Sequence, residues 1–313
     1  MTTEERKLSI KKRLEIPKEG KLPCVFDSDT KNEIDDQYAM AYLLKHEDRF
    51  DIQALYAEPF WMNGRSESPE DGMEQSYAEI FKVLELMDIP VKENFVFKGA
   101  THYITDREHP ERCPAALDLA ERAMQYSPEN PLYVIATGCI SNIGNALLIN
   151  PDIRDNIVVV WLGGHALNMP YNDEYNLKQD LIAVRELFSC ETALVHVACH
   201  GSTSHLVTSI YELERYLVCT SKMGDYLLYI TRDYLAGKRG MQHYGYGTSK
   251  VMWDMGTIAY LVNPSWFVTE VVKTPTINDD CTWVLDKYDH EMITTKYIKR
   301  DPIFYDFFKR MSK

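Results

Sequence analysis

Apolar and polar residues alternate along this chain with two different periods. Five short runs are apolar on both faces, and several are rich in β-branched residues, as buried strands are. They span residues 21–29, 51–57, 131–137, 156–164 and 193–199. Stretches with helical spacing follow several of them, at 33–46, 72–87 and 180–190. This alternation predicts an α/β fold in which helices cover both faces of a mostly parallel central sheet.

The pattern becomes mainly helical after residue 200. Helices are predicted over 211–217, 222–235 and 249–262, followed by a late strand over 265–272.

In the helix over 33–46, we expect the apolar residues on one side. These residues are Ile34, Tyr38, Met40, Ala41 and Leu44.

The tail of the chain has an apolar stripe at helical spacing, made by Phe304, Phe307, Phe308 and Met311. We interpret it as a helix that packs on its own core, and a subunit contact is the alternative. No linker-like change of composition and no repeat divides the chain. We therefore expect one domain over 1–313, with an N-terminal extension over 1–20 and a C-terminal helix over 301–313.

The chain is strongly acidic, with a formal net charge of −13. Such a charge repels phosphate backbones and anionic membranes, so a neutral small molecule or a bound cation is the better partner. No run of residues is apolar enough to span a membrane, and the charged N-terminus lacks the apolar core of a signal peptide. Seven cysteines without a CxxC pair favour a reducing, cytoplasmic location.

The clearest chemical signal is a cluster of acids after the first predicted strand. Asp27 and Asp29 close that strand, and Asp35 and Asp36 open the next helix. Four carboxylates so close together repel one another unless a positive charge lies among them, and hard oxygen ligands suit Ca²⁺ or Mg²⁺. The alternative is that Asp35 and Asp36 are ordinary first-turn acids with Asn32 as the helix cap. We favour the metal.

The stretch VFDSDT also resembles the Asp-x-Asp-x-Thr/Val loop of haloacid-dehalogenase-type phosphatases. However, Lys31 occupies the fifth position of that loop, and we find no GDxxxD-type acidic motif downstream. A phosphatase is therefore the weaker hypothesis.

Four ordered blocks of the sequence resemble the nucleoside hydrolase family of the inosine-uridine preferring type. DSDTKNEIDD resembles its Asp-x-Asp-Pro-Gly-x-Asp-Asp signature, with two extra residues in the loop. YVIATGCISNIGNAL, VVVWLGGHALNMPYNDEYNLKQD and VMWDMGTIAYLVNP are similar to three later blocks, so that the resemblance covers residues 22–264. It implies a Rossmann-like sheet and a Ca²⁺-dependent enzyme that hydrolyses a ribonucleoside to ribose and a free base, in purine or pyrimidine salvage.

The resemblance also implies roles for individual residues. Asp29 would bind Ca²⁺ and act as general base on a metal-bound water. Asp36, Asp254 and the backbone carbonyl of Thr137 would be further ligands. The ribose hydroxyls would be held by Asp35, Asn168, Glu174, Asn176 and Asp254. The family further implies a homodimer or homotetramer, with a small-molecule ribonucleoside as the partner.

These residue types suit the reaction. Cleavage of an N-glycosidic bond passes through an oxocarbenium-like sugar, which nearby carboxylates stabilise. A cation lowers the pKa of its water, and a carboxylate takes the proton. Polar partners for every ribose hydroxyl would reject a deoxyribose. The loop residues Asn168 and Asn176 could instead be turn residues, whereas Asp254 lies in an apolar stretch where a carboxylate needs a partner.

The chain also departs from the family pattern. Trp253 stands where many members have a histidine that protonates the leaving base, and a tryptophan can only stack on that base or line the pocket. YAEP replaces the family's Val-Ala-Gly-Asn, so Glu58 or Asn63 would have to cover the asparagine's role. Candidates for contact with the base are Trp253, His243, Tyr244 and Tyr246. These departures leave two alternatives: a hydrolase of another N-riboside, or a nucleoside- or ribose-binding protein without turnover.

Overall fold

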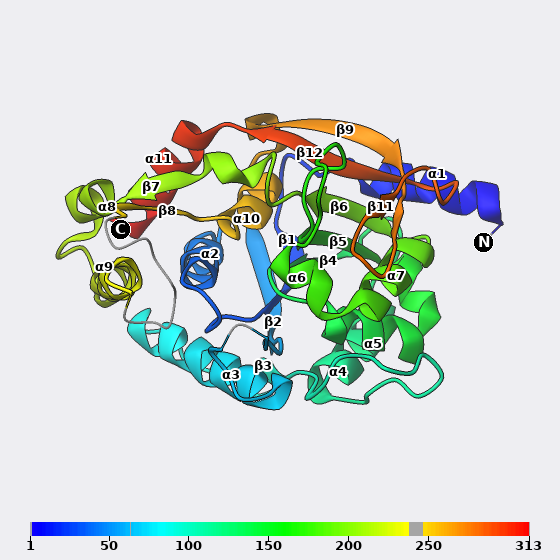
Figure 1. Cartoon of the computed structure of the whole chain (residues 1–313), viewed down its shortest axis with the longest axis horizontal. Coiled ribbons are helices and arrows are strands. Elements are labelled where there is room, and N and C mark those ends of the chain that lie inside the picture. The colour runs from blue at the N-terminus through cyan, green and yellow to red at the C-terminus, as the bar shows by residue number, and fades with distance from the viewer. Residues whose placement is uncertain (1, 63, 238–246, 313) are drawn as a thin grey trace.

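A mostly parallel sheet forms the centre of the molecule (Figure 1). The computed structural model describes residues 2–62, 64–237 and 247–312. In this part of the chain the central sheet has eight strands, of which the last, β9, runs antiparallel to its neighbour. Their order is β3 (Val96–Lys98), β2 (Phe50–Ala57), β1 (Leu22–Ser28), β4 (Leu132–Ala136), β5 (Ile157–Leu162), β6 (Ala193–Val197), β12 (Glu291–Ile298) and β9 (Phe267–Lys273).

Alternate residues of the central strands enter two separate cores, one on each face of the sheet. In β1, Cys24 and Phe26 belong to one core and Val25 to the other. Both faces are therefore apolar, which explains the uninterrupted apolar runs in the sequence. The predicted α/β class is confirmed.

The helices divide between the two faces, as Figure 1 shows. The core that contains Val25 is covered by α4 (Pro114–Arg122), α5 (Ser141–Ile149) and α7 (Leu181–Ser189). The other core is covered by α2 (Asp35–Leu44), α3 (Pro69–Leu86), α8 (Ile210–Leu217), α9 (Lys222–Leu235), α10 (Met255–Val262) and α11 (Arg300–Met311).

Helix α2 differs from its predicted amphipathic form, because all ten of its residues are buried. It packs against α3, α9, α10 and α11, so no side of it faces solvent. The helix begins at Asp35, and its N-cap residue is Ile34, which makes no side-chain cap. The interpretation of Asn32 as the cap is therefore wrong, and two acids in the first turn of a buried helix require another explanation.

The predicted helix over 249–262 is wrong in its first part. Residues Ser249–Val251 form strand β8, which pairs antiparallel with β7 (Val207–Ser209), and the amide of Met252 donates to the carbonyl of Leu206. These backbone bonds hold the segment extended, and α10 begins only at Met255. Asp254 is thus at the N-cap position, where the chain turns, rather than inside a helix.

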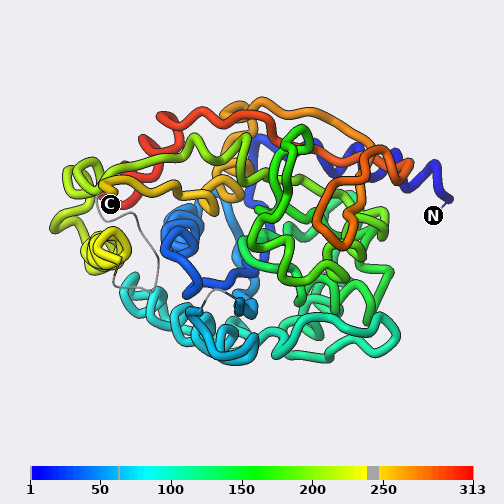
Figure 2. The backbone as a smooth tube through the Cα atoms, viewed as in Figure 1, coloured from blue at the N-terminus to red at the C-terminus, as the bar shows by residue number. Residues whose placement is uncertain are grey.

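The two ends of the chain are helical and lie apart from each other (Figure 2). In α11, the stripe of Phe304, Phe307, Phe308 and Met311 is buried, which confirms packing on the protein's own core. Helix α1 (Thr3–Arg13) lies within the predicted extension 1–20 and contacts β6 and β12. The interpretation of the chain as one domain stays a prediction.

The remaining elements are short. They include α6 (Tyr175–Gln179) and the two-stranded sheet of β10 (Thr276–Ile277) and β11 (Trp283–Val284). Short 3-10 helices span Ala123–Gln125, Pro151–Asp155, Thr203–His205 and Pro264–Trp266. No helix in the described ranges is long and apolar enough to cross a membrane.

Candidate functional site

A cavity of about 360 Å³ opens at the carboxyl ends of the central strands. Asp29 follows β1, Thr137 follows β4, Leu162 ends β5 and Cys199 follows β6. This is the edge at which open α/β sheets bind their ligands. The other residues that line the cavity are Asn32, Glu33, Asp35, Asp36, Arg65, His165, Tyr171, Asp173, Glu174, Tyr175, Asn176, His200, Trp253 and Asp254.

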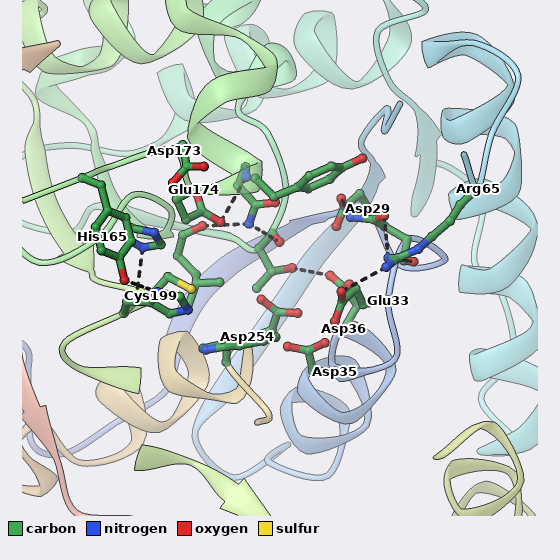
Figure 3. A pocket seen from close by; sticks show the side chains of 18 residues that line it. Asp29, Glu33, Asp35, Asp36, Arg65, His165, Asp173, Glu174, Cys199 and Asp254 are labelled. Atoms are coloured by element: carbon green, nitrogen blue, oxygen red, sulfur yellow. Dashed lines mark hydrogen bonds and ion pairs between the residues drawn. The ribbon is translucent and has the colours of Figure 1, made fainter. Parts of the chain in front are cut away.

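Four buried aspartates line this cavity together. Asp29 comes from the end of β1, Asp35 and Asp36 from the first turn of α2, and Asp254 from the turn before α10. Figure 3 shows Asp254 beside Asp35, with Asp36 and Asp29 further along the same side of the cavity. The structure thus brings together acids that are more than 200 positions apart in the sequence.

The hydrogen bonds of these aspartates leave oxygen atoms open to the cavity. Asp36 Oδ1 accepts from Ser28 Oγ at 2.8 Å and from Thr137 Oγ1 at 3.0 Å. Asp29 Oδ2 accepts from Asn32 Nδ2 at 2.8 Å. Among the described residues, no hydrogen bond reaches the carboxylate of Asp254. A buried carboxylate without donors is costly to ionise unless a ligand or cation supplies the missing partner.

Burial and mutual repulsion act on these acids together. Burial, followed by the charge of Asp36, raises the pKa of Asp29 well above its usual range. Burial, followed by the charge of Asp35, raises the pKa of Asp36 to about 7 and that of Asp254 well above its usual value. A divalent cation would remove this repulsion, and oxygen ligands of this kind fit Ca²⁺ or Mg²⁺. In the described ranges, no three acidic, histidine or cysteine side chains are already drawn together as a metal site.

Glu174 and Asn176 form a second polar wall of the cavity. Glu174 precedes α6 and accepts from the amides of Gly164 at 2.7 Å, Leu177 at 2.9 Å and Asn176 at 3.1 Å. Gly164 has a φ of +73°, which turns its amide toward this carboxylate. Asn176 Nδ2 donates to the carbonyls of Thr137 and Leu162, both at 3.0 Å.

The backbone carbonyl of Thr137, predicted as a metal ligand, therefore already accepts one hydrogen bond. A carbonyl oxygen has two lone pairs, so one remains for a cation. The amide of Asn176 has used both of its N–H bonds, so only its Oδ1 is left for a ligand.

Two other predicted groups do not reach the cavity. Asn168 is exposed and is not among the lining residues. Glu58 is buried and turned inward: its Oε1 accepts from the amide of Asn142, and Cys139 Sγ donates to its Oε2. Burial, followed by the charge of Asp27, raises the pKa of Glu58. The positions of His243, Tyr244 and Tyr246, and of Asn63, lie outside the described residues.

Three lining residues that the sequence did not single out form an aromatic wall. The rings of His165 and His200 stack with centroids 4.3 Å apart, and Tyr171 meets the ring of His165 edge-on. His165 Nδ1 accepts from the amide of His200 at 3.3 Å. Burial, followed by the charge of His200, lowers the pKa of His165 to about 4, so its ring is neutral at pH 7. In Figure 3, His165 and Cys199 lie across the cavity from Arg65.

A cluster of opposite charges, also missed from the sequence, borders the aspartates. Lys250 of β8 is buried and lies 3.1 Å from Asp35 Oδ1 and 2.6 Å from Glu33 Oε2. Arg65 pairs with Glu33 at 3.2 Å. Burial by itself would raise the pKa of Glu33. The positive charges of Lys250 and Arg65 exceed this effect, so the pKa of that carboxyl is lowered. Glu33 belongs to the lengthened first loop, so this loop brings a charge to the edge of the site.

Comparison with known proteins gives a consistent result. The family model for inosine-uridine preferring nucleoside hydrolase matches residues 24–292. A plant nucleoside hydrolase is similar in structure, with 18% identity and a TM-score of 0.73 over 94% of this chain and 99% of that chain. The purine-preferring ribonucleoside hydrolase from Gardnerella vaginalis has 19% identity and a TM-score of 0.72, over 93% of this chain and 98% of its own.

A third similar structure is the inosine-uridine preferring nucleoside hydrolase from Bacillus anthracis, with 15% identity and a TM-score of 0.67, over 93% of this chain and 99% of its own. No curated protein matches the sequence significantly.

Proposed function

The chain belongs to the inosine-uridine preferring nucleoside hydrolase family, whose members are N-glycosyl hydrolases, and from this premise we propose its specific reaction. It cleaves the N-glycosidic bond of a ribonucleoside, releasing ribose and the free base. Asp29 takes a proton from the attacking water. One observation carries this proposal: four buried aspartates share a cavity of about 360 Å³ with Glu174 and Asn176. A cavity of this size suits a small polar ligand.

We propose Ca²⁺ as the cation that compensates the aspartates, held by Asp29, Asp36, Asp254 and the carbonyl of Thr137. The open oxygens of Asp254 and the raised pKa values of Asp29 and Asp36 support this assignment. When bound, the ion supplies polarisation and orientation of a water molecule. The earlier phosphatase hypothesis has no comparable support, because the matching family model is that of a hydrolase of nucleosides.

Asp29 is well suited to act as the base. Its Oδ2 already accepts from Asn32 at 2.8 Å, which orients the carboxylate and leaves Oδ1 to take the proton. Charge on the surrounding acids then stabilises the positive charge that develops on the ribose ring as the bond breaks.

Ribose would be held by groups that can only accept from its hydroxyls. The carboxylate of Glu174 has its direction fixed by three backbone amides, and Asn176 can offer only Oδ1. Asp35 and Asp254 complete this set. A 2′-deoxyribose would leave one buried acceptor without a donor, and such a mismatch is strongly rejected.

The base would lie against Trp253, which lines the cavity in place of the family's histidine. Hydrolysis of another N-riboside is a second candidate, because this tryptophan and the longer first loop both change the base side of the site. We further propose a homodimer or homotetramer, by analogy with the family. A cytoplasmic role in salvage of purines or pyrimidines is supported by seven free cysteines, six of them buried.

The experiment is a substrate panel. Purified protein is incubated with purine and pyrimidine ribonucleosides and their 2′-deoxy counterparts, with Ca²⁺ or with a chelator, and released reducing sugar is assayed. We expect chelator-sensitive release from at least one ribonucleoside, and a rate at least about a hundredfold lower from its 2′-deoxy form. Nucleoside binding without release would contradict turnover and support a binding protein.

A further inference from the structure

Lys250 is the buried cation nearest to the aspartates, and its contacts indicate what it does. Its side chain is 3% exposed. The ammonium has three hydrogens, and three oxygens surround it: Asp35 Oδ1 at 3.1 Å, Glu33 Oε2 at 2.6 Å and the carbonyl of Val251 at 3.0 Å. Lys250 is not among the residues that line the cavity. Because Lys250 lies outside the lining of the cavity, any effect of its charge on a substrate passes through its neighbours.

The same ammonium lies over an aromatic ring of the site. Its Nζ is 3.9 Å from the centre of the Trp253 ring and 5.2 Å from that of Tyr234. A cation at this distance is attracted to the face of an indole, most strongly when water is excluded. The ring face under Lys250 is closed to a ligand, so a base in the cavity meets the remaining surface of Trp253.

One buried cation thus contacts residues from both sides of the site. Asp35 belongs to the proposed ribose side, and Trp253 to the proposed base side. Glu33, from the lengthened loop, holds the ammonium from a third direction, and Arg65 pairs with Glu33 in turn. The longer loop and the tryptophan, which are two separate departures from the family pattern, meet at this lysine.

We propose that Lys250 is a positioning residue that fixes the carboxylate of Asp35 and the ring of Trp253 together, and that its charge beside the indole favours departure of the base. This inference rests on the proposed function. As the N-glycosidic bond breaks, the bonding electron pair goes to the base, which gains negative charge. A positive charge on the other side of the stacked ring stabilises this negative charge without donating a proton.

The test is a comparison of leaving groups. Lys250→Met keeps much of the side-chain length and removes the charge. We expect its kcat to fall at least about tenfold for a ribonucleoside. The fall should be much smaller for 4-nitrophenyl riboside, whose phenolate leaves readily without stabilisation. Lys250→Arg keeps the charge and should restore most of the ribonucleoside rate.

Trp253→Leu provides a second test of the proposal, because it removes the ring that lies between the charge of Lys250 and the base. In that background, Lys250→Met should change the ratio of nucleoside to nitrophenyl rates far less than in the wild type, since the two residues act as a unit. Additive effects on this ratio would overturn the coupling.

A matched control separates positioning from a general loss of stability. Lys31 lies in the same loop, pairs with the buried Glu79 at 2.9 Å and does not line the cavity. Lys31→Met should lower the thermal midpoint and leave the ratio of rates unchanged. If Lys250→Met folds poorly, the double variant Glu33→Gln with Lys250→Met removes the charge of one of the two acids that contact the ammonium, and the same ratio is measured.

The outcomes distinguish this inference from the function on which it rests. Lack of wild-type turnover on every riboside, including the nitrophenyl compound, would overturn both. Wild-type turnover with the same ratio of rates in Lys250→Met would overturn the role of Lys250 alone. A selective loss on ribonucleosides, restored by Lys250→Arg, would support it.

Discussion

Asp29 and Asp254 are the two carboxylates whose chemistry depends most on a cation. Asp29→Asn and Asp254→Asn keep the shape of the side chain and remove its charge. We expect kcat to fall by about 10²–10⁴-fold in Asp29→Asn, the usual contribution of a positioned base, and Ca²⁺ binding to weaken in both variants. Initial rates and calorimetric titration with Ca²⁺ measure the two effects.

The matched control for this prediction is Asp51→Asn, because Asp51 is exposed at the amino end of β2, away from the cavity. Asp51→Asn should change neither kcat nor the affinity for Ca²⁺. Full activity and normal Ca²⁺ content in Asp29→Asn would refute the assignment of the base.

The buried side chain of His196 should make the stability of the fold sensitive to acid. Its Nε2 donates to the carbonyl of Gly163 at 2.8 Å, so in the neutral ring Nδ1 accepts from Thr294 Oγ1 at 2.9 Å. Burial lowers the pKa of His196 to about 4, against an ordinary value of 6.5. Below pH 6.5 the His196 side chain is protonated in the unfolded chain, whereas in the folded chain it stays neutral until about pH 4.

The free energy of unfolding should therefore fall as the pH drops from 6.5 to 4, by about 3 kcal/mol from this group. Above pH 6.5 the contribution is fully present. Urea denaturation at a series of pH values measures it, and His196→Gln should show a correspondingly shallower dependence. An unchanged slope in that variant would show that His196 is not the source.

At the scale of elements, α11 tests how the C-terminal helix contributes to the fold. Phe307 is fully buried, and its ring centre is 5.7 Å from those of Tyr38 and Tyr42 in α2. Phe307→Ala should lower the free energy of unfolding by about 3–5 kcal/mol. Tyr305, two residues before it on the same helix, is 71% exposed, and Tyr305→Ala should cost less than about 0.5 kcal/mol.

Both variants are compared by urea denaturation followed by circular dichroism. Similar costs for the two substitutions would mean that α11 is not held by its apolar stripe. This helix also bears on the site, because α2 carries Asp35 and Asp36 in its first turn.

Elements with a strong apolar signal were predictable from the sequence, and those held by distant backbone partners were not. Strands β1, β4, β5 and β6 are mostly apolar runs in the centre of the sheet. Strand β12 was missed because EMITTKYI mixes threonine, lysine and glutamate, and its place in the sheet depends on pairing with β6 and β9. Segment 249–251 has apolar neighbours, yet pairing with β7 keeps it extended.

At the scale of the whole molecule, the site combines local and distant information. Asp29, Asp35 and Asp36 could be predicted because a strand end and a helix start bring them together within a few residues. Asp254, Glu174 and Asn176 were named through family resemblance, and they line the same cavity. Lys250, His165 and His200 were not predicted, since nothing in the local sequence indicates which distant side chains they meet.

The proposed reaction is tested most directly by following its products with proton nuclear magnetic resonance. Inosine is incubated with the protein and Ca²⁺, then with excess chelator, and then with Ca²⁺ restored. We expect free ribose and hypoxanthine in equal amounts, a halt of the reaction when the chelator is added, and its recovery when Ca²⁺ is restored. If folded, Ca²⁺-bound protein leaves inosine intact, the other ribonucleosides are tested in the same way. Hydrolysis of none of them would contradict the proposed reaction.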